Sequence, residues 1–305
     1  MLSFALFVLL LVGLSDLASF ATAKRLAGEG QHFLVLQHDG QGSIVKGTGF
    51  NGNYQLGDGT NAERNMLVSA LGLDSGIEEV YCGYYGSCAR MTSGESPVLG
   101  LFCQRGQNLS RQRHGLRRHP VHVPGKRARL HCGGLAAENI VSVACGYSHA
   151  CAVDAAGAMF CWGAYSFGQL GNSSITVDFP NPVQVTGITS GVVSAWAGWF
   201  NSFALMQNGT VWAFGKDGYG VFGTGSTGNQ LAPIAFGQGV SGVVEIRGGR
   251  YATCVLLQND RVWCTGRNTN GQLGVGNTTN FQTLVEMVGI PATQSPTSFT
   301  LEPNY

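Results

Sequence analysis

The chain has 305 residues, of which 44% are hydrophobic and only 11% are charged. The hydrophobic content is too high for an intrinsically disordered protein. The formal net charge is +1 at pH 7, so the overall charge does not attract nucleic acid or an anionic membrane. Glycine contributes 46 residues, about twice its usual share of ~7%. Many glycines among short apolar runs predict many strands and turns, in one large β domain or two small ones.

The first predicted element is an apolar segment at residues 4–14, which is too short to cross a bilayer as a helix. Residues 21–23 follow with the small-residue pattern of a cleavage site. We therefore predict a signal peptide over residues 1–23 and a secreted or luminal mature chain that begins near Lys24. No Lys or Arg precedes the apolar segment, so a core strand and an uncleaved anchor of an ectodomain remain as alternatives. We expect no further transmembrane span.

Residues 143–171 contain the unit that the rest of the chain repeats. Apolar runs at 150–153 and 159–162 flank a turn, and Gly163 ends the second run. Such runs, bounded by Gly, Asn and Asp, predict strands in tight hairpins. No helical period of 3.6 residues competes with this interpretation.

The unit recurs, and the repeat outranks any local motif. Its constant feature is a pair of glycines eight residues apart, and a short apolar strand ends each unit, as at 182–187. The glycine pairs are Gly49/Gly57, Gly163/Gly171, Gly215/Gly223 and Gly266/Gly274. The spacing gives five units of about 51–57 residues, at about 30–75, 76–138, 139–190, 191–241 and 242–290.

The residues at 146–153, followed by Cys161-Trp-Gly and Gln169-Leu-Gly, resemble the repeat of the regulator of chromosome condensation (RCC1-like) family. The resemblance covers about residues 30–290 and implies one four-stranded blade per repeat in a β-propeller, usually of seven blades. We therefore expect an all-β propeller over residues 24–290 and a Ser/Thr/Pro-rich tail at 291–305. Five units fit either a closed ring or an incomplete seven-bladed ring.

The cysteines occur mainly in pairs across predicted hairpins. Units have cysteine at both matching positions or at neither, which is the pattern that cross-strand disulfides predict. The expected pairs are Cys88–Cys103, Cys151–Cys161 and Cys254–Cys264. Each would add about 2–3 kcal/mol to stability; the alternative is buried thiols. Cys82 and Cys145 are expected to pair between blades or to remain thiols, and Cys132 makes the count odd.

The sequence contains no clear catalytic, cofactor or metal motif. Two G-x-G-x-x-G matches, at 47–52 and 223–228, fall in predicted loops and not between a strand and a helix. Ser148, His149 and Asp154 do not have the arrangement of a catalytic triad, and we expect His149 to bond to backbone within its blade. The cysteine spacings also miss those of zinc sites. We expect no enzyme, no cofactor and no bound metal.

Two further groups of residues indicate how a secreted propeller would be used. Asn172, Asn208 and Asn277 begin glycosylation sequons in predicted turns. Loop aromatics are candidates for a partner-binding face, because interfaces favour Tyr and Trp; the alternative is packing between blades. These candidates are Tyr165, Phe167, Trp199, Phe200, Tyr219 and Tyr251.

Residues 99–135 do not fit the repeat. They are rich in Arg, Lys and His and contain no acid. They are interpretable as a basic loop for nucleic acid, glycans or an acidic protein, as a solvated insertion, or as a local reading-frame error. We base no function on them.

The resemblance implies three classes of function. We expect a non-catalytic, monomeric protein-interaction scaffold that is secreted or luminal, with an unidentified protein as its partner and no nucleic acid. The first alternative is guanine-nucleotide exchange on a Ran-like GTPase, against which the predicted signal peptide and disulfides argue. The second alternative is a carbohydrate-binding propeller.

Overall fold

The computed structural model describes residues 26–29, 31–38, 43–91, 140–174 and 179–289. The regular elements in these ranges are β-strands and one short 3-10 turn, η2 (Phe236–Gln238). The first strands are β1 (Leu26–Glu29), β2 (His32–His38), β3 (Ser43–Gly49), β4 (Arg64–Ser69), β5 (Ile77–Cys82) and β6 (Ser87–Met91). The next are β7 (Ile140–Cys145), β8 (His149–Asp154), β9 (Met159–Gly163), β10 (Phe179–Gln184), β11 (Val192–Ala197) and β12 (Asn201–Met206). The last are β13 (Val211–Gly215), β14 (Gln230–Ala235), β15 (Val243–Gly248), β16 (Ala252–Leu257), β17 (Val262–Gly266) and β18 (Phe281–Glu286).

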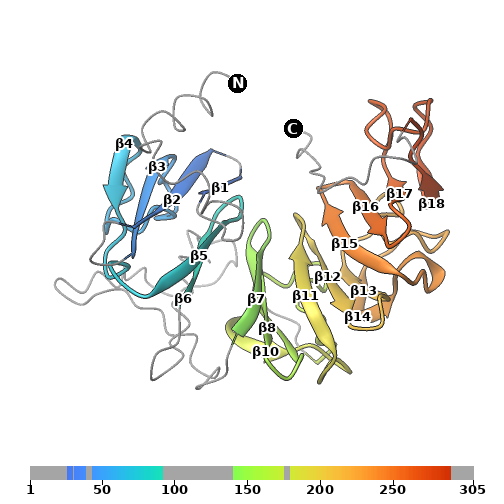
Figure 1. The fold of residues 1–305 in the computed structure, drawn as a ribbon, viewed down its shortest axis with the longest axis horizontal. Helices are drawn as coiled ribbons and strands as arrows, with labels where there is room; N and C mark the ends of the chain where they lie inside the picture. Colours follow the sequence, from blue (N-terminus) through green and yellow to red (C-terminus); the bar gives the residue numbers. More distant parts are fainter. Residues whose placement is uncertain (1–25, 30, 39–42, 92–139, 175–178, 290–305) are drawn as a thin grey trace, which may run out of the picture.

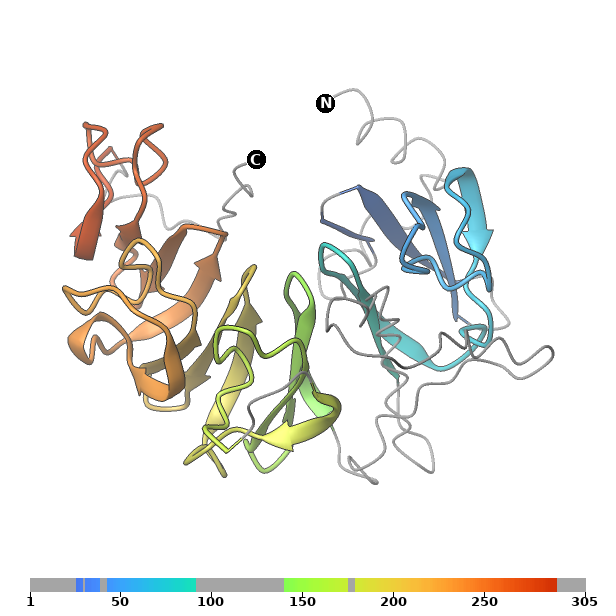
Figure 2. The same cartoon turned by 180° about the vertical axis from the view of Figure 1, so that it is seen from behind.

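Each sheet is built from strands that follow one another in the chain. The sheets are β1–β4, β5–β6, β7–β10, β11–β14 and β15–β18, all antiparallel. They lie side by side in chain order along an arc (Figure 1; Figure 2 from behind). The first strands of neighbouring sheets contact one another, so β1, β5, β7, β11 and β15 form a continuous row. The molecule is therefore all-β, with its sheets arranged as the blades of a propeller.

The observed strands differ from the predicted units at the start of the first unit and in the second unit. β1 begins at Leu26, before residue 30, where the first unit was expected to start. Two strands of the second unit are described, and residues 99–135, the basic stretch, lie outside the described residues. No helix in the described ranges is long and apolar enough to cross a bilayer.

The fourth strand of a unit begins earlier than its apolar pattern predicts. β10 covers Phe179–Gln184, whereas the pattern predicts a strand at 182–187. Phe179 pairs with Gly163, and the register then shifts before the next pair. The fourth and fifth sheets have the same shift between their third and fourth strands. Because a bulge breaks the alternation of side chains, the pattern alone misplaces this strand.

The first glycine of each repeating pair permits this shift. Gly163 has φ +108°, and a Cβ placed on it would lie 2.6 Å from the backbone oxygen of Ser148. Gly49, Gly215 and Gly266 have φ between +102° and +112° and are similarly crowded by backbone. Only glycine takes this conformation without strain and without an atom in the crowded space.

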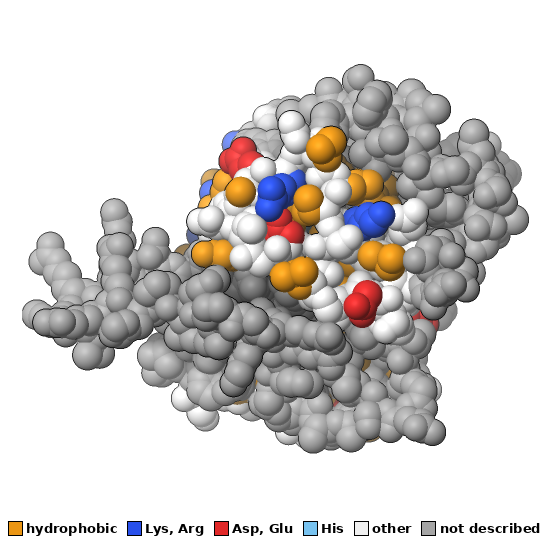
Figure 3. All heavy atoms as spheres, turned by 90° about the vertical axis from the view of Figure 1, so that its left-hand side faces the viewer, with side chains coloured by type: hydrophobic (Ala, Val, Ile, Leu, Met, Phe, Trp, Pro, Cys, Tyr) orange, Lys and Arg blue, Asp and Glu red, His pale blue; other side chains and the backbone are white. Residues whose placement is uncertain are grey.

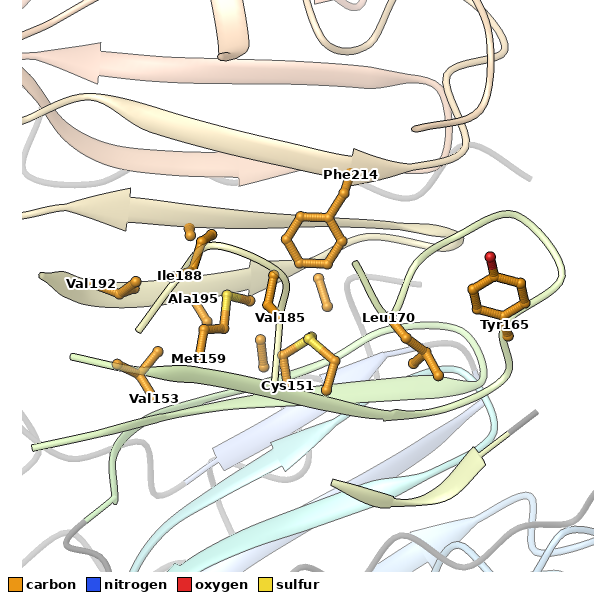
Figure 4. Packing of buried hydrophobic residues seen from close by; sticks show 14 residues of the cluster. Cys151, Val153, Met159, Tyr165, Leu170, Val185, Ile188, Val192, Ala195 and Phe214 are labelled. Atoms are coloured by element: carbon orange, nitrogen blue, oxygen red, sulfur yellow. A yellow bond between two sulfur atoms is a disulfide. The ribbon is translucent and has the colours of Figure 1, made fainter. Parts of the chain in front are cut away.

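The hydrophobic core lies between consecutive sheets. Val153, Met159, Leu170 and Phe214 are fully buried in the layer that joins β7–β10 to β11–β14 (Figure 4). Tyr165 lies at one end of the same layer and is 8% exposed. For Tyr165 the alternative of packing between blades is therefore correct, and not the role in a partner-binding face, because this residue lies in the core.

Two of the expected disulfides are present. Cys151 is bonded to Cys161 and Cys254 to Cys264, each pair directly opposite across a hairpin with Cα atoms 4.1 Å apart. The prediction that Cys88 bonds to Cys103 is wrong. Cys88 is bonded to Cys145, and their Cα atoms are 7.0 Å apart. Cys103 and Cys132 lie outside the described residues.

The position of Cys145 explains this correction. It ends β7, and β7 packs directly against β6, which contains Cys88. The bond therefore joins two neighbouring sheets instead of two strands of one hairpin. Cys82, the cysteine at the end of β5, donates from Sγ to the backbone oxygen of Ala27 at 3.3 Å.

Buried histidines also join neighbouring sheets. Nε2 of His149 lies 2.9 Å from Oγ of Ser202, which itself donates to the backbone oxygen of Gln169. Because that hydroxyl hydrogen is used, His149 donates to Ser202. His32 lies 2.8 Å from Ser87 in the same way. The expectation of a bond within one blade is therefore wrong, and burial lowers the pKa of His149 to about 4, so it is neutral at physiological pH.

The face at the first-sheet end of the arc is chemically mixed. In its described part, hydrophobic side chains alternate with charged and polar ones (Figure 3). Met66 and Leu67 of β4, and Leu71 shortly after it, are exposed. Isolated apolar residues are normal on a protein surface, so this face gives no functional signal.

We expect Gly163→Ala to lower the free energy of unfolding by about 2–4 kcal/mol, since it adds a backbone clash to an unfavourable φ. Gly187→Ala is the matched control, because Gly187 also has positive φ (+76°) but has no atom within 4 Å of the added Cβ. The control should cost about 1–2 kcal/mol. Equal losses for both variants, measured by chemical denaturation, would contradict the role given to backbone crowding.

Candidate protein-interaction site

The turns between the first and second strands, together with the loops after the third strands, place aromatic and cationic side chains next to one another across four sheets. We call this set the aromatic strip. Its aromatic members are Tyr84, Tyr85, Tyr147, Phe167, Trp199, Phe200, Tyr219 and Tyr251, and its cations are Lys216, Arg250 and Arg267.

Glycine at the start of each turn brings the strip together. A Cβ on Gly83 would overlap the backbone oxygen of Gly146, and a Cβ on Gly146 would overlap that of Gly198. A Cβ on Gly198 would lie 2.9 Å from the oxygen of Gly249. Neighbouring turns are therefore in direct backbone contact, and any side chain at these positions would push the sheets apart.

Backbone hydrogen bonds fix the same turns to one another. The N–H of Tyr85 donates to the oxygen of Tyr147, and the N–H of Tyr147 donates to the oxygen of Trp199, both at 3.2 Å. These bonds run between sheets and not within one. They set the spacing of the side chains that follow each glycine.

The residue directly after each glycine forms the centre of the strip. The rings of Tyr84 and Tyr147 stack with centroids 4.8 Å apart and planes 17° apart. Tyr147 and Trp199 follow at 4.7 Å, and the Arg250 guanidinium carbon lies 4.1 Å from the Trp199 centroid. Tyr84 and Trp199 are also 5.3 Å apart, so one side chain from each of four sheets contributes to a single cluster.

Further rings from the same sheets flank this cluster. Phe200 lies 5.0 Å from Tyr147 and 5.0 Å from Phe167. Tyr219 and Tyr251 meet edge to face at 4.9 Å. Each such aromatic pair is worth about 0.5–1.5 kcal/mol beyond area burial, so the strip is held in place before any partner binds.

The cations of the strip lie over rings and not beside acids. Nζ of Lys216 is 4.5 Å from the Phe167 centroid, and Arg267 is 5.6 Å from that of Tyr251. In the part of the chain that the structure describes, no carboxylate forms an ion pair with Lys216, Arg250 or Arg267. The arginines that do have carboxylate partners are Arg64, Arg90, Arg247 and Arg261.

The tyrosine hydroxyls add polar groups to the strip. Tyr147 donates its hydroxyl hydrogen to the hydroxyl of Tyr85 at 3.0 Å. Burial and this bond raise the pKa of Tyr147 above its ordinary value, so it stays neutral. The described residues contain no group of three His, Cys, Asp or Glu that could hold a metal ion.

The structure brings together five of the aromatic candidates from the sequence, all except Tyr165. The strip residues that the sequence analysis missed are Tyr84, Tyr85, Tyr147, Lys216, Arg250 and Arg267. A signal for them was available, because Tyr84, Tyr147, Trp199 and Arg250 all follow the first glycine of the turn in their own units. Lys216 and Arg267 likewise follow Gly215 and Gly266, the glycines that end the third strands.

The loops that carry Lys216 and Arg267 are held from inside by a buried polar residue. Asn268 accepts the N–H of Leu273 at 2.9 Å and donates from Nδ2 to a loop carbonyl at 2.8 Å. Asn51 does the same in the first unit. Asp217 takes this position in the fourth unit, directly after Lys216.

The carboxyl group of Asp217 fits the position less well than an amide. The residue is 2% exposed, and its Oδ1 has no hydrogen-bond partner among the described residues. Burial raises its pKa to about 6, although the N–H groups of residues 220–222 donate to it. The folded state therefore disfavours the ionised form.

We expect Asp217→Asn to stabilise the protein at pH 7 by roughly 1 kcal/mol, allowing for solvent screening of the charge. The folded pKa lies above the unfolded value, so the wild-type penalty is absent below about pH 4 and complete above about pH 6. The stability gain of the variant should therefore grow from pH 4 to 6 in urea titrations. A gain that does not change with pH would contradict this assignment.

The glycosylation sequons lie in turns. The Oδ1 atoms of Asn172, Asn208 and Asn277 accept the N–H of the residue two positions later, at 3.1, 3.0 and 2.9 Å respectively. Asn208 and Asn277 are exposed, whereas Asn172 is half-buried and donates from Nδ2 to the oxygen of Gln184.

Family models identify the repeat. The regulator of chromosome condensation (RCC1) repeat matches residues 140–169, 192–221 and 243–272, and a second model of this repeat matches residues 156–205. These matches include the turns that carry Tyr147, Trp199 and Arg250.

Curated relatives share the sequence over most of the chain. The ultraviolet-B receptor UVR8 of Arabidopsis thaliana is 27% identical over 273 residues, which is 88% of this chain and 58% of the receptor. The probable E3 ubiquitin-protein ligase HERC4 of Homo sapiens is 31% identical over 210 residues, 68% of this chain and 19% of the ligase. The chain thus spans less than two thirds of either relative.

Solved structures share the fold. Human WBSCR16 aligns with a TM-score of 0.67 at 21% identity, over 90% of this chain and 68% of that one. Yeast RCC1 (Prp20), in its complex with Kap60, aligns with a TM-score of 0.62 at 16% identity, over 91% of this chain and 65% of that one.

Proposed function

Since the chain belongs to the regulator of chromosome condensation (RCC1) repeat family, we propose that it is a non-catalytic interaction scaffold of the secretory pathway or extracellular space. It binds another protein through the aromatic strip. The observation that carries this proposal is the gathering, around the buried Trp199, of half-buried and exposed rings from four sheets with three cations that have no carboxylate partner among the described residues. Tyr, Trp and Arg are the residues that most often dominate the energy of protein interfaces.

The cysteine and asparagine chemistry supports the proposed compartment. The bonds of Cys151 to Cys161 and of Cys254 to Cys264 belong to oxidising environments. Exposed sequons at Asn208 and Asn277 suit glycosylation in that environment. The proposed signal peptide at residues 1–23 lies outside the described residues.

Guanine-nucleotide exchange is the alternative function that a structurally similar protein suggests. A solved structure of yeast Prp20p is described together with its binding properties to Gsp1p and histones, and it aligns with a TM-score of 0.59 at 17% identity. Identity this low supports the fold and not the activity. A nucleotide-release assay with a Ran-like GTPase distinguishes the two functions, and we expect no acceleration.

We expect the protein expressed in a eukaryotic host to be secreted, to begin near Lys24, and to lose mass after glycan removal. Intact mass before and after reduction with alkylation measures all three. The variant Asn208→Gln/Asn277→Gln should remove the glycans on those two turns, and Asn280→Gln, which is outside any sequon, is the control. Retention inside the cell with a free Met1 start and reduced cysteines would contradict the proposed compartment.

The interaction itself is tested by quantitative affinity capture from extracellular fluid with wild-type protein and two variants. We expect Phe167→Ala/Tyr219→Ala to lose at least one specifically captured protein, because it removes ring surface from the strip. Trp212→Ala is the matched control, since Trp212 is 37% exposed and Tyr219 36%, but Trp212 lies outside the strip. Identical captured sets for all three proteins would contradict binding through the strip.

A further inference from the structure

The geometry of the strip points to the chemistry of its partner. Resting on the proposed function, we propose that the aromatic strip binds an extended acidic segment of another protein, with carboxylates placed along Lys216, Arg250, Arg267 and the ring edges.

The central rings pack closely against one another. Tyr147 stacks on Tyr84 and packs against Trp199, Tyr84 and Trp199 are themselves 5.3 Å apart, and the Arg250 guanidinium covers Trp199. A nucleic-acid base binds to an aromatic surface through a free ring face. These contacts cover ring surface that such a ligand needs, which disfavours stacking of bases and sugars.

Ring edges and unpaired cations favour carboxylates. The edge of an aromatic ring carries partial positive charge, whereas its face carries partial negative charge. Lys216, Arg250 and Arg267 add full positive charges without a carboxylate partner among the described residues. Because Tyr147 donates to Tyr85, the hydroxyl hydrogen of Tyr85 remains available for an acceptor. All these groups attract the same kind of ligand, an anion with oxygen acceptors.

Arg250 has a buried hydrogen-bond donor that a ligand is able to satisfy. Its guanidinium lies 4.1 Å from the Trp199 centroid and 4.5 Å from that of Tyr251, and its buried Nε has no hydrogen-bond partner in the part of the chain that the structure describes. Arg is suited to bidentate recognition of carboxylates. A carboxylate beside Arg250 would therefore accept hydrogen bonds from a guanidinium group that the two rings already hold in place.

The strip crosses the turns of four neighbouring sheets. Tyr84, Tyr147 and Trp199 form a cluster with centroids 4.7 to 5.3 Å apart, and Arg250 continues it on the next sheet. An extended segment is able to contact side chains from all of these turns. The strip is unsuited to pairing with a second copy of itself, since that would bring like charges together.

The test measures binding of a labelled peptide of about ten residues, alternating Glu and Gly, to the full chain by fluorescence anisotropy. We expect Lys216→Gln/Arg267→Gln to weaken binding at least about tenfold. The control Lys46→Gln/Arg261→Gln removes the same charge away from the strip and should change affinity less than about twofold. A matching Gln-Gly peptide should not bind. Equal losses in both variants, or no binding by the wild type, would overturn the proposal.

Two further measurements test whether the strip binds a different anionic polymer or a second copy of this chain. Tighter binding of a sulfated oligosaccharide or single-stranded DNA, lost in Lys216→Gln/Arg267→Gln, would overturn the assignment to an acidic peptide. A dimer in sedimentation that this variant abolishes would assign the strip to self-association instead. Failure of the peptide together with a protein lost on Phe167→Ala/Tyr219→Ala would leave the proposed function standing and reject only this inference.

Discussion

The structure depends on backbone contact between neighbouring sheets at the turn after each first strand. Glycine at positions 83, 146 and 198 allows the next turn to approach so closely that a Cβ would collide with its carbonyl oxygen. The inter-sheet hydrogen bonds of the Tyr85 and Tyr147 amides form only at this distance. Hydrophobic burial between sheets supplies most of the stabilisation, but it does not specify the spacing as these contacts do.

The aromatic strip follows from the same contact. Because consecutive turns touch, the side chains after each glycine lie 4–5 Å apart and stack before a partner is present. A preorganised surface loses little conformational entropy on binding. The buried bond of His149 to Ser202 and the bond of Cys88 to Cys145 join sheets close to these turns. The proposed binding surface therefore lies beside the contacts that hold neighbouring sheets together.

The sequence predicted the features that depend on local spacing. Hairpins, glycine pairs and the bonds of Cys151 and Cys254 to cysteines ten residues later are set within one unit. It did not predict the Cys88–Cys145 bond or the partner of His149, and it left the packing of Tyr165 open, because each depends on how two sheets meet. The strip was partly predicted: Trp199 and Phe200 stood out as loop aromatics, while Arg250 became visible only when equivalent turns were compared.

Hydrogen exchange of the Tyr147 amide tests the central claim most directly. This amide lies in a turn, yet it donates to Trp199 of the next sheet. It should therefore exchange slowly, close to the rate set by global unfolding. The Thr210 amide is the internal reference, since it donates to Asn208 in an exposed turn and should exchange fast. Exchange of Tyr147 as fast as that of Thr210 would show that the turns are not in fixed contact and would contradict the account.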